Sequence, residues 1–195
     1  KQDYFFSVKA DFSSSQQIQQ MMDTIYKSFK TINVLVNNSG VALYKLITDT
    51  TLEEWNKLFD VNIKSIFLIT NSVLKGMISA KSGSIVNISS MWGLTGSSME
   101  VAYSSSKSAI IGYTKALAKE VGLCNINVNC VCPGVIKTPM NAHLSKSDID
   151  ELIDQTPLAR LGECQDVAEL VYFLSSQKAS FITGQIISCD GGFAL

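Results

Sequence analysis

Short apolar segments alternate with longer amphipathic segments along this 195-residue chain, and this alternation is what most constrains its fold. The pattern is typical of a parallel β-sheet with helices on both faces, an α/β architecture of the doubly wound, Rossmann-like kind. We therefore predict a single domain over residues 1–195, built on one such sheet. The predicted strands are Tyr4–Val8, Asn33–Asn37, Ser84–Ile88, Ile126–Val131 and Ile186–Cys189.

Helical periodicity marks the segments between these strands. In the first of them, apolar residues recur at helical spacing from Ile18 to Phe29, after serines that can cap a helix. Further along the chain, Thr50 and Glu53 have the spacing of a capping box. Both features indicate amphipathic helices packed against a sheet. The remaining helices are predicted over about Thr51–Ala80, Ala102–Val121 and Asp166–Ser175.

The charge balance excludes some classes of partner. The chain has 16 Lys and Arg against 17 Asp and Glu, for a net charge of -1. Such a balance gives no reason to expect binding to nucleic acid or to acidic membranes. No apolar run reaches the roughly 18 residues that a membrane span requires.

The cysteine pattern bears on the cellular compartment. Five cysteines without paired spacing argue against a disulfide framework, and the single histidine, His143, lies in a polar stretch that offers no zinc site. We expect buried structural thiols in a protein of the reducing cytoplasm, without a metal. These cysteines are Cys124, Cys130, Cys132, Cys164 and Cys189.

Polar clusters follow three of the predicted strands, at Asn37–Gly40, Ser89–Gly93 and Pro133–Thr138. In parallel sheets of this kind, ligands bind beyond the carboxyl ends of the strands. Glycine at position 40 would allow a ligand to approach the backbone closely. The sequence therefore predicts a binding site where these three clusters meet.

Tyr103 and Lys107 are four residues apart in a predicted helix, so their side chains share one face, with Cβ atoms about 5–6 Å apart. A free tyrosine has a pKa near 10 and is a poor base at neutral pH. A neighbouring ammonium would lower this pKa, so that Tyr103 could exchange a proton with a carbonyl or alcohol oxygen. Alone, the spacing also fits an amphipathic tyrosine beside a surface lysine.

Two more residues favour the chemical interpretation. Ser90 ends the preceding strand, where its hydroxyl could hydrogen-bond the same substrate oxygen. Asn62 lies within a predicted helix, where asparagine is unfavourable, and we expect it to be buried near a bend in that helix.

Together these residues resemble the pattern of the short-chain dehydrogenase/reductase family, and the resemblance covers the chain from end to end. Within the family, the chain is most similar to bacterial 3-oxoacyl-(acyl-carrier-protein) reductases, over residues 107–120, 157–167 and 182–192. The positions that carry the family pattern are Asp11, Asn37, Asn38, Ser39, Gly40, Asn62, Ser90, Tyr103, Lys107, Pro133, Gly134 and Thr138.

The resemblance implies an NAD(P)-dependent oxidoreductase that reduces a carbonyl to an alcohol by hydride transfer. It implies that Tyr103 is the general acid/base, that Lys107 lowers its pKa and binds the nicotinamide ribose, and that Ser90 holds the substrate oxygen. Asn62 would position a water molecule in a proton relay. The cofactor would be NADP or NAD, with NADP favoured by the resemblance. Its implied contacts are Asp11, Phe12, Asn38, Gly40, Tyr103, Lys107, Pro133, Gly134, Ile136 and Thr138.

The family's phosphate-binding glycine loop has no counterpart in this sequence. The resemblance therefore implies that residues 1–195 are the last three-quarters of a Rossmann-fold domain, with roughly fifty residues before Lys1. Those residues would include the ones that choose between NAD and NADP. We would expect residues 1–195 alone neither to fold nor to bind cofactor, because the sheet would have open edges.

The leading prediction for the substrate is a 3-oxoacyl thioester, free or bound to acyl carrier protein. Lys81 matches a position that helps to dock the carrier protein beside the entrance, whereas Cys124 stands where a basic residue is expected. The segment Met140–Gln155 would be a substrate lid, in which catalysis by His143 is not expected. The alternatives are a relative acting on a sugar, polyol or hydroxysteroid, and a dinucleotide-binding protein without catalytic activity.

We also expect self-association. The two long predicted helices carry more apolar residues than one sheet-facing stripe requires, and a surplus apolar face suggests a symmetric interface. The family resemblance implies a homotetramer. The surplus residues are Ile66, Ile69, Val73, Ile110, Ile111, Tyr113 and Leu117.

Overall fold

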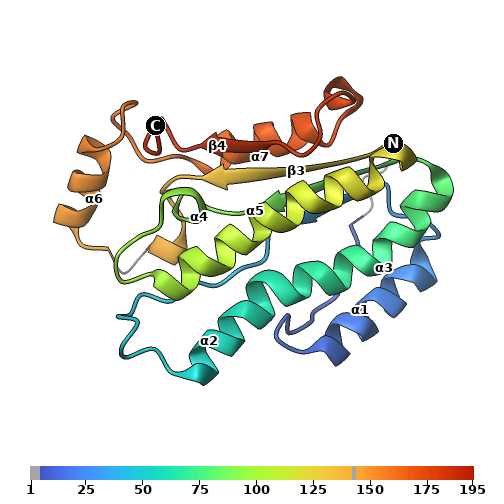
Figure 1. Ribbon diagram of the computed structural model, residues 1–195, viewed down its shortest axis with the longest axis horizontal. Helices are drawn as coiled ribbons and strands as arrows, with labels where there is room; N and C mark the ends of the chain where they lie inside the picture. The colour runs from blue at the N-terminus through green and yellow to red at the C-terminus, as the bar shows by residue number, and fades with distance from the viewer. Residues whose placement is uncertain (1–4, 142–143) are drawn as a thin grey trace.

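The computed structural model describes residues 5–141 and 144–195. Its centre is a four-stranded, fully parallel sheet in the order β1-β2-β3-β4, with helices on both faces (Figure 1). The predicted α/β fold of the Rossmann-like kind is thus confirmed. The strands are β1 (Val34–Asn37), β2 (Gly83–Ile88), β3 (Ile126–Pro133) and β4 (Ile186–Cys189).

Seven α-helices connect or flank these strands in the part of the chain that the structure describes. None of the helices in this part is both long and apolar enough to cross a membrane. The helices are α1 (Ser15–Ser28), α2 (Leu52–Phe59), α3 (Ser65–Ala80), α4 (Trp92–Thr95), α5 (Val101–Val121), α6 (Lys146–Asp154) and α7 (Cys164–Leu174), with a π-helical turn at Asp60–Lys64 and 3-10 turns at Gly122–Cys124, Pro139–Asn141 and Gln177–Ala179.

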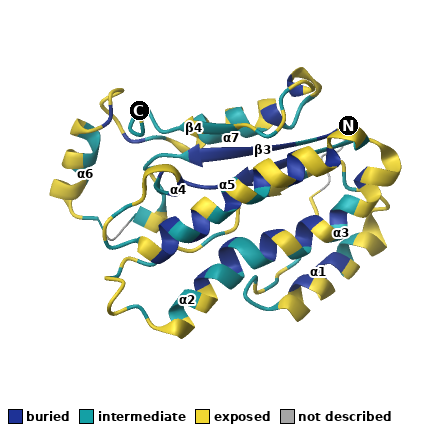
Figure 2. Cartoon of the chain, viewed as in Figure 1, coloured by how far each residue is buried: buried dark blue, intermediate teal, exposed yellow. Residues whose placement is uncertain are grey.

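Both faces of the central strands β2 and β3 are buried, because successive residues of a strand point to opposite sides, whereas Val34 and Val36 on the edge strand β1 are exposed. On β2, Ile85 packs in the cluster formed with α1, α3 and α5. Its neighbour Val86 packs with Val131 in the cluster formed with α7. Figure 2 shows β3 as buried along its length and α5 as buried on one side only. This two-sided burial is why the strands appear in the sequence as continuous apolar runs.

The start of the chain differs from the prediction. No strand forms at residues 5–8, and Tyr4 lies outside the described residues. The Phe6 ring contacts Phe29 edge to face and Val8 packs against the core, but no strand of the described residues pairs with this segment, and a strand requires a neighbour with which to pair. The predicted serine cap of the first helix is confirmed, since the Ser14 hydroxyl accepts a hydrogen bond from the Gln17 N–H (3.3 Å).

The predicted capping box is displaced by one residue. Thr51 Oγ1 accepts from the Glu54 N–H (3.2 Å), and Glu54 Oε2 accepts from the Thr51 N–H (2.9 Å). Thr50 instead donates its hydroxyl to the Leu46 carbonyl (2.9 Å) and closes the preceding turn. Both Thr50–Glu53 and Thr51–Glu54 have the spacing of a capping box, so the sequence alone does not distinguish them. The conformation of the turn before the helix decides which pair forms the box.

The long helix predicted over Thr51–Ala80 is interrupted at its middle. Between α2 and α3 the chain forms one π-helical turn, in which the Ser65 N–H donates to the Asp60 carbonyl five residues earlier. Asn62 lies in this turn and is fully buried, as predicted. Such turns occur often at functional sites, because the extra residue re-aims the groups around it.

The apolar residues that predicted an interface are mostly core residues of this chain. Ile66, Ile69, Val73, Ile110 and Leu117 are all buried. The reason is that α1 packs on α3 and that α3 and α5 share the inner face of the sheet, so each helix buries two stripes. These five residues therefore do not form a surplus apolar face, whereas Ile111 and Tyr113 are half-buried, and self-association stays a prediction.

Candidate active site

The three polar clusters come together at the carboxyl edge of the sheet, as predicted. There they line an open cleft of about 1110 Å³ between the ends of β1, β2 and β3, the start of α5, and the α6–α7 region. Most of the predicted site residues lie in its wall. They are Asn38, Gly40, Ser90, Tyr103, Lys107, Pro133, Gly134, Ile136 and Thr138.

Lys107 is held at the floor of this cleft. Its side chain is only 4% exposed, and Nζ donates to the Ile88 carbonyl at the end of β2 (3.0 Å). Burial lowers the pKa of Lys107 from 10.5 to about 8, an effect that the neighbouring thiols of Cys130 and Cys132 oppose. An ammonium has three donors, so Lys107 can still donate into the cleft.

Tyr103 lies beside Lys107 on the first turns of α5, and Lys107 Nζ is 5.6 Å from the centroid of its ring. Burial raises the pKa of Tyr103 from 10.0 to about 12, although a hydrogen bond with Ser90 lowers it; the charge of Glu100 adds to the increase. The pKa of Tyr103 is thus raised overall, and the lowering effect predicted for Lys107 stays a prediction. The free-energy cost of burying a phenolate is larger than any stabilisation that the nearby ammonium group of Lys107 provides. At neutral pH Tyr103 is a neutral phenol and can donate a proton.

Ser90 follows β2 and is also largely buried. Its Oγ accepts a hydrogen bond from the Trp92 N–H (3.2 Å), two residues further along the chain. A hydroxyl that accepts from the backbone in this way keeps its own proton for another acceptor. Ser90 can therefore donate to Tyr103 or to a substrate oxygen placed between them.

Asn62 lies behind the cleft rather than in its wall. Its Nδ2 donates to the Val41 carbonyl (2.9 Å) and to Ser106 Oγ (3.0 Å), and its Oδ1 accepts from the Val41 N–H (2.8 Å). The carboxamide thereby fastens the segment after Gly40 to α5. These three hydrogen bonds all go to protein atoms. The predicted water relay through Asn62 stays a prediction.

Gly40 keeps the floor of the cleft open. A Cβ atom at this position would lie 3.3 Å from Lys107 Nζ and 3.3 Å from Asn62 Oδ1. Any side chain here would crowd the ammonium group, so the absence of a side chain leaves room for a ligand beside Lys107.

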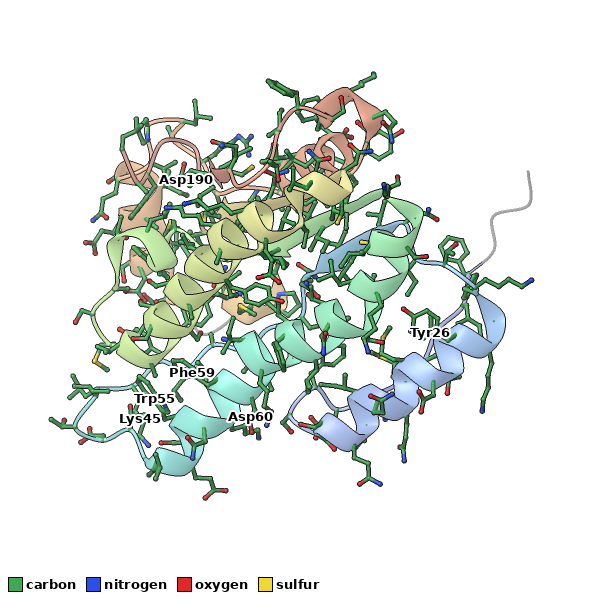
Figure 3. All side chains as sticks on the ribbon, turned by 45° about the vertical axis from the view of Figure 1, so that its right-hand side comes forward. Tyr26, Lys45, Trp55, Phe59, Asp60 and Asp190 are labelled. Atoms are coloured by element: carbon green, nitrogen blue, oxygen red, sulfur yellow. The ribbon has the colours of Figure 1, made fainter. Side chains whose placement is uncertain are left out.

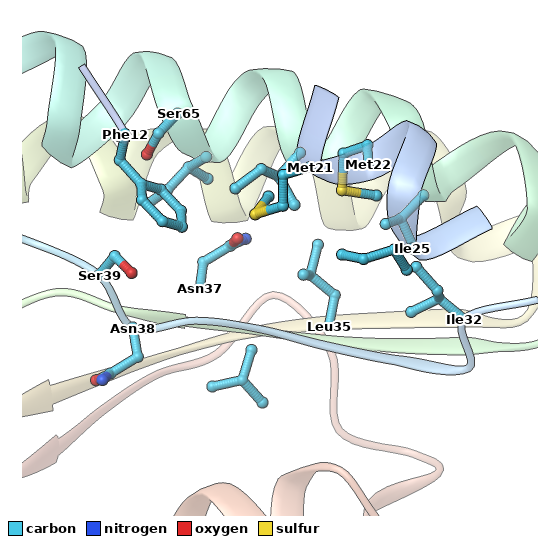
Figure 4. A pocket seen from close by; sticks show the side chains of 14 residues that line it. Phe12, Met21, Met22, Ile25, Ile32, Leu35, Asn37, Asn38, Ser39 and Ser65 are labelled. Carbon is cyan, nitrogen blue, oxygen red and sulfur yellow. The ribbon is translucent and has the colours of Figure 1, made fainter. Parts of the chain in front are cut away.

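Asp11 and Phe12 do not line this cleft. Phe12 lines a smaller apolar pocket of about 200 Å³ between α1, α3 and β1, which shares Asn38 and Ser39 with the cleft (Figure 4). The Asp11 carboxylate accepts from the Ser13 N–H (2.8 Å) and hydroxyl (2.7 Å), which holds its pKa below the usual range. Their predicted contacts with the cofactor remain predictions.

The thiols differ in exposure: two are buried, Cys124 and Cys189 are half-buried, and one is exposed. All five cysteines are free, and Cys130 and Cys132 are buried in the core as predicted. Cys164 is exposed at the start of α7 and lines the cleft, so the prediction of a buried thiol is wrong there. His143 lies outside the described residues, and residues 5–141 and 144–195 contain no group of three metal-ligating side chains.

Lys81 lies far from the cleft entrance. It follows the last turn of α3 and precedes β2, and its carbonyl accepts from Asn125 Nδ2 (3.3 Å) before β3 begins. This is the amino edge of the sheet, whereas the cleft is at the carboxyl edge. The prediction that Lys81 lies beside the entrance is therefore wrong within this chain.

Sequence reasoning assigned no positioning role to two serines that hold the site together. Ser89 Oγ donates to the Lys107 carbonyl (2.8 Å) and joins the end of β2 to α5. Ser106 Oγ, which accepts from Asn62, donates in turn to the Tyr103 carbonyl (2.7 Å). Their only signal was their position directly beside Ser90 and Lys107 in the sequence.

The residues present fit a nicotinamide dinucleotide. The cleft exceeds the usual range for a single drug-sized ligand, so it can take a dinucleotide together with a substrate. Lys107 offers donors for ribose hydroxyls, and the space beside Gly40 gives access to them.

This fold, with a tyrosine, a lysine and a serine gathered at its carboxyl edge, is that of a dinucleotide-dependent oxidoreductase. The chain belongs to the short-chain dehydrogenase/reductase family: the family model described as "Enoyl-(Acyl carrier protein) reductase" matches residues 1–194. It is accordingly an oxidoreductase that acts on the CH–OH/C=O pair with a nicotinamide dinucleotide.

Several relatives make the comparison more specific. The 3-oxoacyl-(acyl-carrier-protein) reductase of Chlamydia muridarum is 41% identical over 184 residues, which are 94% of this chain and 74% of that protein. The enzyme of the same name from Aquifex aeolicus is 41% identical over 185 residues, 95% of this chain and 75% of that one.

Solved structures agree with these relatives in fold. The crystal structure of 3-oxoacyl-(acyl-carrier-protein) reductase from Brucella melitensis has a TM-score of 0.88 at 34% identity, over 93% of this chain and 70% of that one. A protein assigned as a gluconate dehydrogenase from Agrobacterium tumefaciens has a TM-score of 0.91 at 29% identity, over 94% and 74% of the two chains.

Proposed function

We propose that this protein reduces 3-oxoacyl thioesters to 3-hydroxyacyl thioesters, with NADPH preferred over NADH, and that its natural substrates are bound to acyl carrier protein. The relatives named above support the substrate class. The observation that carries the chemistry is the convergence of Ser90, Tyr103 and Lys107 on one point of the cleft floor.

In this proposal the protein supplies the proton for the carbonyl oxygen and orients the substrate and the cofactor. The nicotinamide, when bound, supplies a hydride to the carbonyl carbon. Tyr103 donates its phenol proton to the carbonyl oxygen, and Ser90 donates a hydrogen bond to the same oxygen as negative charge develops there. The neutral state of Tyr103 at pH 7 is the state that reduction needs.

Lys107 has two tasks in this scheme. Its remaining donors hold the ribose hydroxyls, and its charge lies close enough to Tyr103 to stabilise the phenolate that forms when the proton leaves. Asn62 is a positioning residue, since it fixes the Val41 segment and, through Ser106, the start of α5.

The outer wall of the cleft suits an acyl chain. Met140, Leu144 and Leu152 line it from the segment that includes α6. Figure 1 shows α6 at the margin of the molecule, apart from the layers that cover the sheet. We propose that this segment closes over the substrate and excludes water.

The second candidate is reduction or oxidation of a sugar acid or a polyol. It is favoured by the close structural similarity to the protein assigned as a gluconate dehydrogenase. Ser97, Ser98 and Gln155 also line the cleft and could serve several hydroxyl groups. The same four central residues would serve this reaction, so only the substrate separates the two candidates.

Two further properties belong to the proposal. A homotetramer is proposed from the family resemblance, and its interface does not use the buried residues of α3 and α5. A cytoplasmic location is proposed from the free thiols, because buried reduced cysteines suit a reducing compartment.

The test is a substrate panel on the intact protein. NADPH and NADH oxidation would be followed with acetoacetyl-coenzyme A and with 3-oxoacyl groups on acyl carrier protein, and the reverse reaction with gluconate and polyols. Turnover of the thioesters, faster with NADPH, is expected. Turnover of gluconate alone would establish the second candidate, and cofactor binding without turnover of any substrate would favour a non-catalytic protein.

A further inference from the structure

Trp92 is a large side chain in the cleft wall that none of the proposed chemistry uses. It begins α4, directly after Ser90 and Met91, and its half-buried side chain lines the same cavity as Tyr103. Its backbone N–H donates to Ser90 Oγ (3.2 Å), so the residue that presents the indole also orients the serine. The position of this ring therefore depends on the same short loop as the proposed substrate-oxygen contact.

The ring of Trp92 is supported from the other end of the chain. The Phe193 ring meets it edge to face, with centroids 5.4 Å apart and planes at 87°. This arrangement is favourable for two aromatic rings and fixes the orientation of both. Figure 1 shows the C-terminus beside α4, although the two segments are about a hundred residues apart in the sequence.

The segment that carries Phe193 is itself a closed turn. The Asp190 carboxylate accepts from the Gly192 N–H and the Ala194 N–H (both 3.0 Å), and the Asp190 carbonyl accepts from the Phe193 N–H (3.3 Å). A Cβ at Gly134 would lie 2.8 Å from Asp190 Cα, so the turn rests directly on the cleft residue Gly134. Phe193 is thus a fixed support.

We propose that Trp92 is the residue that limits acyl-chain length in this enzyme, and that Phe193 is a positioning residue that holds the Trp92 ring in the cleft wall beside Ser90. The proposal rests on the proposed reduction of 3-oxoacyl thioesters and names the substrates within that class: short chains are preferred to long ones. A rigid indole held by a second ring cannot turn aside for a longer chain without losing that contact.

The test compares chain lengths on the intact protein. We would measure kcat/KM for 3-oxoacyl-coenzyme A substrates of four, eight and twelve carbons in the wild type, Trp92→Ala, Phe193→Ala and Phe193→Tyr. The wild type should prefer four carbons. In Trp92→Ala the ratio of twelve-carbon to four-carbon kcat/KM should rise about 10- to 100-fold, the range for relieving a few methylene clashes in a pocket.

Phe193→Ala should shift the same ratio in the same direction but by less, and Phe193→Tyr, which keeps the ring, should restore the wild-type ratio. A loss of structure alone would lower all three kcat/KM values together and leave the ratio unchanged. Phe181→Ala is the matched control, because this phenylalanine is fully exposed and lies outside the cleft. An unchanged ratio in both Trp92→Ala and Phe193→Ala would overturn the proposal.

A binding measurement separates this proposal from the proposed function. The chain has two tryptophans, and Trp55 stacks on Phe59 (4.7 Å, 19°) on α2, away from Asp190 and its turn (Figure 3). In a Trp55→Phe background, Trp92 emission would be titrated with 3-hydroxybutyryl- and 3-hydroxydodecanoyl-coenzyme A in the presence of oxidised cofactor. A saturable change, tighter for the shorter ligand, is expected.

Absence of thioester turnover in the wild type would refute the proposed function. The titration of Trp92 emission would still show whether Trp92 contacts the acyl chain. Trp92 emission that responds to neither ligand, or that reports tighter binding of the twelve-carbon ligand, would refute the limit on chain length even if turnover is fast.

Discussion

Replacement of Lys107 by methionine should remove a pH dependence of stability that the wild type has between pH 7 and pH 10. Lys107 is buried at the cleft floor, and its pKa in the folded chain is about 8, against 10.5 for an exposed lysine. Between these two values, the unfolded chain keeps a proton that the folded chain has released. The free energy of unfolding of the wild type therefore rises with pH in this window.

The size of the effect follows from the shift in pKa. Each pKa unit corresponds to about 1.4 kcal/mol, so the full shift corresponds to about 3 kcal/mol. The destabilisation is complete below pH 8 and is relieved as the pH rises toward 10.5. Between pH 7 and pH 10 we expect the stability of the wild type to increase by about 2–3 kcal/mol relative to Lys107→Met.

Urea unfolding of the intact wild type and of Lys107→Met at pH 7, 8, 9 and 10 measures this difference. Groups that do not interact with Lys107 cancel in the comparison, and the raised pKa of Tyr103 destabilises the fold only above about pH 10, beyond this range. Lys115→Met, which replaces an exposed lysine on the same helix, should leave the pH dependence of the wild type unchanged. A constant or falling difference between wild type and Lys107→Met would refute the argument that Lys107 is a buried cation.

Two further substitutions test other parts of the site. Ser90→Ala should lower kcat about 10²- to 10³-fold, because one hydrogen-bond donor to the developing oxyanion is lost. Steady-state kinetics measures this loss, and a cofactor titration should show little change in cofactor affinity. A kcat near that of the wild type would contradict the role of Ser90. Gly93→Ala should destabilise the protein by about 1–3 kcal/mol in urea unfolding, because its Cβ would lie 2.8 Å from Ser89 Oγ. Gly112→Ala, with nothing within 4 Å, should instead stabilise α5, and equal effects of the two glycine changes would count against the packing argument.

Much of the fold could be predicted because it depends on local sequence patterns. β4 matches its predicted bounds, and Asn62 is buried in a distorted helical turn, as its unfavourable position in a helix had indicated. The three polar clusters meet at one edge because parallel strands all end on the same side. The chemistry at that edge could therefore be placed before any distance was known.

The remainder depends on contacts between distant residues. The pKa of Tyr103 follows from its burial, which its spacing from Lys107 does not determine. Ile69 and Val73 seemed surplus because no local pattern shows that α1 packs on α3. The contact between Trp92 and Phe193 joins α4 to the turn near the C-terminus, about a hundred residues further along the chain, and neither residue belongs to a recognisable spacing.

The central claim is that Tyr103 donates the proton during carbonyl reduction. The most direct test is NADPH oxidation by acetoacetyl-coenzyme A in the intact wild type and in Tyr103→Phe, with cofactor affinity measured for both. We predict that kcat falls about 10²- to 10⁴-fold in Tyr103→Phe, the usual contribution of a general acid, while the affinity for NADPH changes little. A Tyr103→Phe protein that keeps more than about a tenth of the wild-type kcat would contradict the account, because no proton from this side chain would then be required.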